Sequence, residues 1–181
     1  KGVDFLFDAM QTARLRADTR LIIVGDGPDE NRIRLHAQRA GVANSIVWTG
    51  RLADPAEAYA AMDTLILPSL YEAFGMVILE AMAAGVPVVA RRGNGRTVMT
   101  ASEEIIDHGH TGMIVEPHDL NELANTLHHL ENDKSHRHAM GTAARFIAGQ
   151  YTWQHYASRC LAMLNQPANT EYYDEYHHRA A

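Results

Sequence analysis

Two glutamates separated by seven residues, Glu72 and Glu80, are the residues of this 181-residue chain whose types and spacing best suit chemistry. Between them lies Gly75, in a stretch typical of a turn that leads from a buried strand into a helix. The start of a helix presents unpaired backbone N–H groups and the positive end of the helix dipole, and both favour a bound phosphate. Glycine lets a ligand approach the backbone closely, and carboxylates accept hydrogen bonds from hydroxyl groups. The pattern therefore predicts a site for a phosphate-bearing polyol, such as a nucleotide sugar.

The elements that must position these glutamates follow from the hydrophobic periodicity. We predict a buried strand over residues 64–68 and a helix over residues 76–84 that is stopped by Gly85. Strands and helices also alternate along the rest of the chain, which predicts a parallel sheet covered on both faces, with ligands at the carboxyl ends of the strands. The fold class is therefore α/β, a doubly wound Rossmann-like sheet. The other expected helices span residues 3–17, 28–40, 55–62, 120–131, 135–148 and 152–164, and the other strands span 20–24, 45–49, 86–90 and 112–115. Asp119 can cap the helix that begins at residue 120.

The residues around the two glutamates closely resemble the retaining glycosyltransferases of family 4, also called group 1. The resemblance covers roughly residues 1–165 and implies the second, C-terminal donor-binding domain of the two-domain GT-B fold. The motifs that carry it are Glu72-Ala73-Phe74-Gly75 and Glu80-Ala81-Met82-Ala83-Ala84-Gly85-Val86-Pro87-Val88-Val89, with Lys1-Gly2-Val3-Asp4, Val24-Gly25-Asp26-Gly27-Pro28, Thr49-Gly50-Arg51, Leu67-Pro68-Ser69 and His110-Thr111-Gly112 as further landmarks in the family's order.

This resemblance implies roles for the residues of the first motif. Glu80 would hold the ribose hydroxyls of the nucleotide, and Glu72 would hold the hydroxyls of the donor sugar. The backbone N–H groups of Phe74, Gly75 and Met76 would face the sugar and the diphosphate. We expect the side chain of Phe74 to belong to the core.

Two further contacts are implied by the resemblance. Lys1 would neutralise charge that develops on the leaving diphosphate, so Lys1 and Glu72 are the predicted catalytic residues. Gly50, Arg51 and Leu52 would hold the nucleobase, largely through backbone groups, so the side chains do not identify the base. The alternatives are a flexible N-terminal lysine and a solvated Arg51.

Metal and cofactor sites are not predicted. The turn at Gly25 and Gly27 has Glu30 where the dinucleotide fingerprint needs a third glycine. The histidines at 108, 110, 128 and 129 lack companion ligands at a recognisable spacing, and Cys160 is the single cysteine. By resemblance the substrate is a nucleoside diphosphate sugar, and no cofactor is needed.

The stretch from Arg91 to Thr100 departs from the family, which has a short Gly-Gly turn there. It looks like an extra loop, and Arg91, Arg92 and Arg96 are either ligand contacts or solvated side chains.

Composition limits the remaining classes of function. The net charge of −6 argues against broad binding of nucleic acid, and the single cysteine fits a reducing, cytoplasmic compartment. Since no apolar stretch reaches 18 residues, we expect no transmembrane segment. We predict one domain over residues 1–165, with its first strand missing, and a tail over 166–181 that is either frayed or packed on an absent domain.

The expected function is transfer of a sugar, with retention of configuration, from a nucleoside diphosphate donor to a hydroxyl acceptor. The chain looks cut from a longer protein, so we expect it to be inactive without its N-terminal acceptor domain, which is also where peripheral membrane contact would arise. One alternative is an epimerase or phosphorylase on the same plan, although neither Lys1 nor Lys134 suits a pyridoxal site. Another is a non-enzymatic doubly wound binding module.

Overall fold

The computed structural model describes residues 1–164, and the predicted tail over 166–181 lies outside the described residues. The chain divides into a compact unit, Lys1–Ala148, and a second unit that begins at Gly149 and contains helix α7 (Trp153–Leu164). The strands of the described residues all belong to the first unit, which carries every residue of the predicted site.

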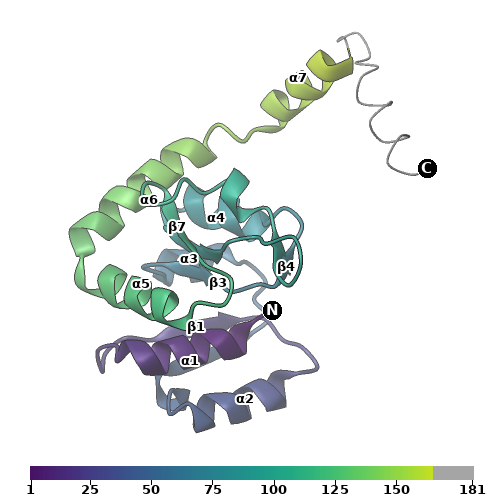
Figure 1. The fold of residues 1–181 in the computed structure, drawn as a ribbon. Coiled ribbons are helices and arrows are strands. Elements are labelled where there is room, and N and C mark those ends of the chain that lie inside the picture. The colour runs from purple at the N-terminus through teal and green to yellow at the C-terminus, as the bar shows by residue number, and fades with distance from the viewer. Residues whose placement is uncertain (165–181) are drawn as a thin grey trace. The chain divides into compact units, whose positions relative to one another are not determined.

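Helices and strands alternate along the first unit, as the periodicity predicts (Figure 1). The helix expected over residues 3–17 ends early because Arg14 takes the left-handed conformation, with φ at 48°. Two-residue strands at β4 and β6 were not predicted. The elements are α1 (Val3–Ala13), β1 (Leu21–Val24), α2 (Glu30–Arg39), β2 (Ile46–Gly50), α3 (Ala56–Ala61), β3 (Leu65–Leu67), β4 (Tyr71–Glu72), α4 (Met76–Ala83), β5 (Val88–Arg91), β6 (Met99–Thr100), β7 (Gly112–Val115), α5 (Leu120–Asn132) and α6 (Lys134–Ala148), with 3-10 turns at Ala43–Ser45 and Ser102–Glu104.

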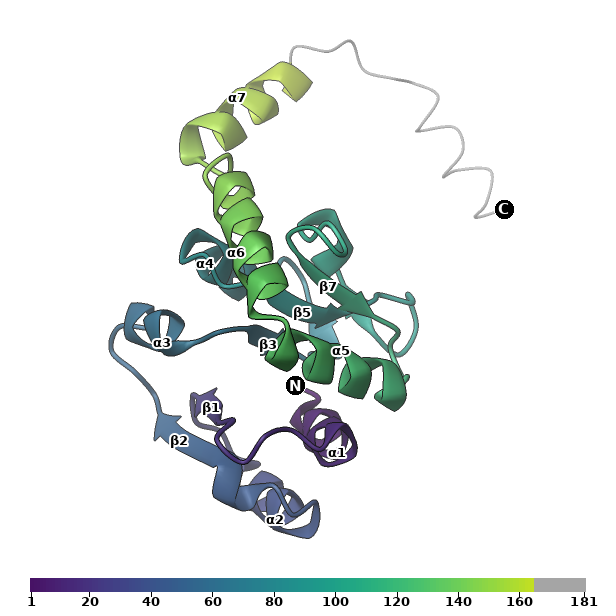
Figure 2. The same ribbon diagram turned by 90° about the vertical axis from the view of Figure 1, so that its left-hand side faces the viewer.

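All pairs of strands in the described residues are parallel, and they form three pieces; Figure 2 labels the strands of two of them. The central piece has the order β3-β5-β7, with Leu65 opposite Val88 and Val88 opposite Gly112. The strands β1 and β2 form a second piece, and β4 pairs with β6. Both β1 and β3 are edge strands of their pieces and line the same cavity. Among the described strands, no hydrogen-bonded pairing joins β1 to β3.

Helices cover both faces of the sheet, as the doubly wound prediction requires. Successive residues of β5 alternate between two core clusters, because side chains along a strand point to opposite faces. Val89 joins the cluster under α1, α2 and α5, which contains Phe7 and Leu123. Val88 joins the cluster under α3, α4 and α6, which contains Ile78 and Met82. The predicted α/β fold class is confirmed.

Two predicted helix boundaries are also confirmed. The carboxylate of Asp119 caps α5 by accepting the backbone N–H of Glu122 at 2.9 Å. Gly85 follows α4 in the left-handed conformation and ends it. Local signals of this kind fix the ends of the two helices.

Candidate functional site

A sharp turn at the carboxyl end of the central sheet carries the first motif. The chain leaves β3, forms β4 and then enters α4 through Gly75, whose φ is 75° and ψ is 55°. A Cβ atom at this position would lie 2.8 Å from Cδ1 of Ile78 and 3.4 Å from Cγ of Glu72. The turn therefore needs glycine both for its backbone conformation and for space, and it brings Glu72 against the start of α4.

Glu72 and Lys1 meet beside this turn, although 71 positions separate them. The Nζ atom of Lys1 lies 3.1 Å from Oε2 of Glu72, whose side chain is 22% exposed, while the lysine side chain is 72% exposed. The two predicted catalytic residues are therefore placed together, with an ammonium group and a carboxylate near the N–H groups that open α4.

Glu80 lies one turn into α4 and is held by a residue that the sequence did not indicate. The hydroxyl of Tyr59, on α3, donates to Oε2 of Glu80 at 2.7 Å. Burial, and secondly this hydrogen bond, raise the pKa of Tyr59 well above its ordinary value, so the phenol stays protonated and the carboxylate stays an acceptor. No motif places a tyrosine 21 positions before a glutamate, so only the packing of α3 against α4 reveals the pair.

The prediction that Phe74 belongs to the core is wrong. Its side chain is 48% exposed, because it lies in the turn one residue before Gly75 and outside both core clusters. Other exposed apolar side chains on the same segment, or on the paired strand β6, are Leu70, Tyr71, Met76 and Met99.

The predicted base-binding residues lie at the ends of β1 and β2. The N–H of Gly25 donates to the carbonyl of Gly50 at 2.7 Å, which joins the two strand ends. Arg51 is exposed, and its guanidinium lies 3.1 Å from the carboxylate of Asp26. Leu52 is half-buried. The turn at Gly25 and the start of the segment from Gly50 to Leu52 are thus joined at the carboxyl ends of β1 and β2.

The stretch from Arg91 to Thr100 is ordered by its own hydrogen bonds and is not simply an extra loop. Its last two residues, Met99 and Thr100, are β6 and pair with Tyr71 and Glu72 of β4. The side chain of Asn94 accepts the N–H groups of the three residues from 96 to 98. This stretch therefore braces the segment that carries Glu72.

The three arginines of this stretch have different surroundings. Arg91 ends β5 and is buried, so the prediction of a solvated loop is wrong for this residue. Arg92 forms ion pairs with Glu103 and, at 2.8 Å, with Glu116. Arg96 is exposed in the turn.

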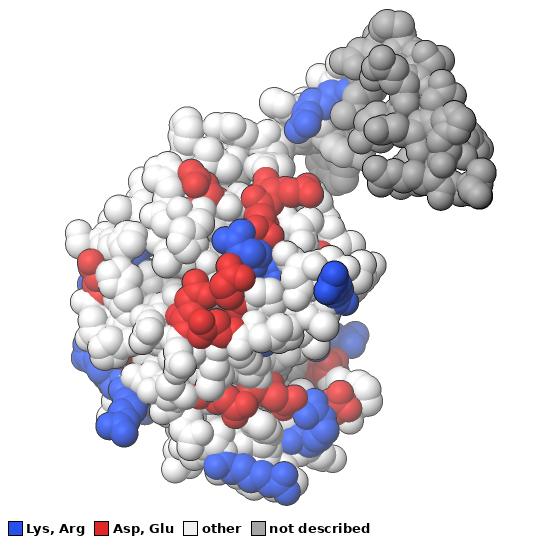
Figure 3. Space-filling model, in the orientation of Figure 1, with Lys and Arg blue, Asp and Glu red and all other residues white. Residues whose placement is uncertain are grey.

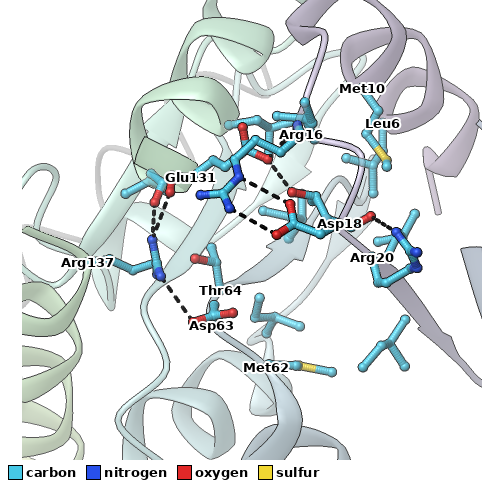
Figure 4. Close-up of a pocket in the computed structure, with 18 of the residues that line it drawn as sticks. Leu6, Met10, Arg16, Asp18, Arg20, Met62, Asp63, Thr64, Glu131 and Arg137 are labelled. Carbon is cyan, nitrogen blue, oxygen red and sulfur yellow. Dashed lines mark hydrogen bonds and ion pairs between the residues drawn. The ribbon is translucent and has the colours of Figure 1, made fainter. Parts of the chain in front are cut away.

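A cavity of about 440 Å³ in the first unit lies elsewhere (Figure 4). It opens at the amino ends of β1 and β3, between α1 and α5, whereas ligands of parallel α/β sheets bind at the carboxyl ends. Two of its arginines are already paired, since Arg16 pairs with Asp18 at 2.9 Å and Arg137 pairs with Asp63 at 3.1 Å. We therefore do not assign the predicted chemistry to this cavity.

The surface drawn in Figure 3 carries acidic side chains over its middle, with fewer basic groups among them. A face of this kind does not attract a polyanion such as nucleic acid. Among the described residues, no helix combines the length and the hydropathy that crossing a bilayer requires.

Comparison with known sequences identifies relatives along nearly the whole described chain. The family model "Glycosyl transferases group 1" matches residues 1–146. A GDP-mannose-dependent alpha-(1-6)-phosphatidylinositol monomannoside mannosyltransferase of Mycobacterium tuberculosis is 34% identical over 175 residues, which cover 91% of this chain and 44% of that protein. A D-inositol 3-phosphate glycosyltransferase of Stackebrandtia nassauensis is 35% identical over 89% of this chain and 38% of its own length. The chain thus spans less than half of these relatives.

Comparison with solved structures gives the same architecture. The HepE protein of Anabaena, solved in complex with UDP and glucose, has a TM-score of 0.73 and 30% identity over 83% of this chain and 40% of its own. WaaG, a glycosyltransferase involved in lipopolysaccharide biosynthesis, has a TM-score of 0.74 and 27% identity over 92% of this chain and 44% of its own. TarM of S. aureus, at a TM-score of 0.80 and 20% identity over 91% of this chain and 33% of its own, supports the fold alone.

Proposed function

The chain belongs to the group 1 glycosyl transferases, and we propose that it is the part of such an enzyme that binds the nucleoside diphosphate sugar. The observation that carries this proposal is the meeting of Lys1 and Glu72 beside the glycine turn that opens α4. A cation, a carboxylate and the N–H groups at a helix start suit a ligand that carries both phosphates and hydroxyl groups.

The two ends of the donor would bind at two edges of this site. The segment from Gly50 to Leu52 would hold the base, mainly through backbone groups. Glu80 would accept hydrogen bonds from the ribose hydroxyls, and its hydrogen bond with Tyr59 limits the rotation of the carboxylate. Such pre-orientation lowers the entropy lost when the ligand binds.

The diphosphate and the sugar would bind at the α4 turn. The N–H groups of Phe74, Gly75 and Met76 would face the phosphate oxygens. A diphosphate would compete with Glu72 for Lys1, because both anions favour the same ammonium group. Release of Glu72 from Lys1 would leave its carboxylate available for the hydroxyls of the sugar.

The proposed reaction is transfer of the sugar to an acceptor hydroxyl with retention of configuration. As the bond between the sugar and the diphosphate breaks, negative charge develops on the leaving oxygen, and Lys1 would stabilise it. No metal ion or cofactor is assigned to this step. The acceptor would bind to an N-terminal domain that this chain does not contain, and any peripheral membrane contact would also involve that domain.

The identity of the nucleotide's base can be tested directly. Guanine and uracil are both candidates, because one relative is named as GDP-mannose-dependent and HepE was solved with UDP. We would titrate the chain with UDP, GDP and ADP by NMR, alongside Glu80→Ala. Glu104→Ala is the control, since Glu104 is an exposed carboxylate of the 3-10 turn. Selective binding of one nucleotide that Glu80→Ala weakens and Glu104→Ala leaves unchanged would support the proposal. Equal binding by all three proteins would contradict the role of Glu80.

A further inference from the structure

Two adjacent arginines differ sharply in how their charges are compensated. Arg91, the last residue of β5, is 3% exposed, and no carboxylate oxygen lies within 4.0 Å of its guanidinium among the described residues. Arg92 is half-buried and pairs with both Glu103 and Glu116. The buried charge of Arg91 is therefore the uncompensated one.

The guanidinium of Arg91 lies under the start of α1. Its central carbon is 3.8 Å from the centre of the Phe5 ring. Gly2, which precedes α1, packs so closely that a Cβ atom there would lie 2.1 Å from the carbonyl oxygen of Pro68 and 3.5 Å from Nη1 of Arg91. The turn formed by Lys1 and Gly2 thus runs directly over the buried guanidinium.

The surroundings of Arg91 favour an anion. Burial lowers the pKa of Arg91, and its Nε atom has no hydrogen-bond partner among the described residues. The first N–H groups of α1 lie at the positive end of a helix of 11 residues that has no side-chain cap, and the one carboxylate of its first turn, on Asp4, is paired with Arg32 at 2.8 Å. A buried cation beside a second positive group is unfavourable unless negative charge is brought to it.

The hydroxyl of Ser69, two residues after β3, is also buried and without a partner among the described residues. Since β3 and β5 are neighbours, both orphaned groups lie at the same edge of the sheet. This edge is also the one that carries the Lys1–Glu72 pair.

We propose that Arg91 supplies the uncompensated positive charge of a phosphate subsite formed by the Lys1–Gly2 turn and the first N–H groups of α1. The proposal rests on the proposed function, and it assigns to this subsite the terminal phosphate of the nucleoside diphosphate. Lys1 already pairs with Glu72, whereas Arg91 has no carboxylate partner among the described residues, so its charge is not offset before the ligand binds. Phe5 and the packing of Gly2 hold the guanidinium in place.

The test compares Arg91→Met, Arg91→Lys and the control Arg92→Met in the 181-residue chain. Each protein is titrated with UDP, GDP, the corresponding nucleosides and inorganic pyrophosphate by NMR, and its ligand-free melting temperature is measured. Arg91→Met should weaken diphosphate and pyrophosphate binding about tenfold to a hundredfold and leave nucleoside binding unchanged, since charge-assisted contacts are lost. The affinity of Arg91→Lys for these anions should lie between the affinities of the wild type and Arg91→Met. Arg92→Met should bind them as the wild type does.

Melting separates this role from a structural one. Arg91→Met should melt at or above the wild-type temperature, because an uncompensated buried charge is replaced by an apolar side chain. Wild-type affinity for the diphosphate in Arg91→Met would overturn the proposal. So would a lower melting temperature with equal losses of nucleoside and diphosphate binding, since a structural role predicts that result.

The same titrations distinguish this proposal from the proposed function. Binding of pyrophosphate that depends on Arg91, with no tighter binding of UDP or GDP than of pyrophosphate and no binding of the nucleosides, would support the phosphate subsite and contradict a site for the nucleoside. A wild-type chain that binds none of these anions would overturn both.

Discussion

Replacing Gly75 by alanine should destabilise the first unit by about 2 kcal/mol. A left-handed backbone costs a residue with a Cβ atom about 1–2 kcal/mol, and the smaller entropy of unfolded alanine returns about 0.4–1 kcal/mol. The new Cβ would lie 2.8 Å from Cδ1 of Ile78, which is fully buried, and overpacking of that kind adds about 1–3 kcal/mol.

Gly41→Ala is the matched control for the backbone contribution. Its φ is 72°, close to the 75° of Gly75, but no atom lies within 4 Å of a Cβ built there. Gly41→Ala should therefore lose about 1 kcal/mol of stability or less, since only the cost of the left-handed backbone conformation remains. The difference between the two variants measures the contact with Ile78.

Urea denaturation and thermal melting followed by circular dichroism are suitable assays. A loss of about 2 kcal/mol corresponds to roughly 4–8 °C in melting temperature for a domain of this size. The Ile78→Val substitution removes Cδ1 and should cost about 0.5–1.5 kcal/mol by itself. Combined with Gly75→Ala, it should cost about 1 kcal/mol less than the sum of the two. Strict additivity, or equal losses in Gly75→Ala and Gly41→Ala, would refute the contact with Ile78 as the cause.

Three further predictions concern other contacts. Tyr59→Phe should lose about 1 kcal/mol in denaturation, because the hydrogen bond to Glu80 is removed. Since the pKa of Tyr59 is higher in the folded than in the unfolded chain, the folded state binds the extra proton above about pH 10, so wild-type stability should fall there as pH rises, more steeply than in Tyr59→Phe. Asp119→Ala should lose about 1 kcal/mol and Asp119→Asn much less, because both oxygen-bearing side chains can accept the N–H of Glu122; an equal loss in both would contradict the cap. The 181-residue chain alone should release no diphosphate from a nucleotide sugar in the presence of acceptor, and measurable release would contradict the need for an acceptor domain.

The sequence was sufficient where the signal is local. The buried run at 112–115, the cap at Asp119 and the glycine stop at Gly85 each depend on a few neighbouring residues, and the structure confirms all three. The alternation of strands and helices along the sequence was likewise sufficient to predict a parallel sheet covered by helices on both faces. The Glu72 and Glu80 motif identified the family, which the comparison with known sequences confirms.

The sequence was insufficient where two distant segments define a residue's surroundings. Strands β4 and β6 have two residues each, too few for a period, and they exist only because they pair with one another. Phe74 has the large apolar side chain expected of a core residue, but the turn at Gly75 leaves this side chain at the surface. Tyr59 becomes a partner of Glu80 only when α3 packs beside α4.

The sequence by itself determined the fold class, the family and the order of the motifs, because periodicity, capping and motif spacing act over short stretches of chain. Only the tertiary structure decided which charges are compensated. Arg91 and Arg92 are neighbours of the same residue type, yet within the part of the chain that the structure describes Arg91 lies under α1 with no carboxylate partner, and Arg92 pairs with two carboxylates. The physical reason is that burial and charge pairing depend on long-range packing, which brings Lys1 to Glu72 and α1 over the end of β5.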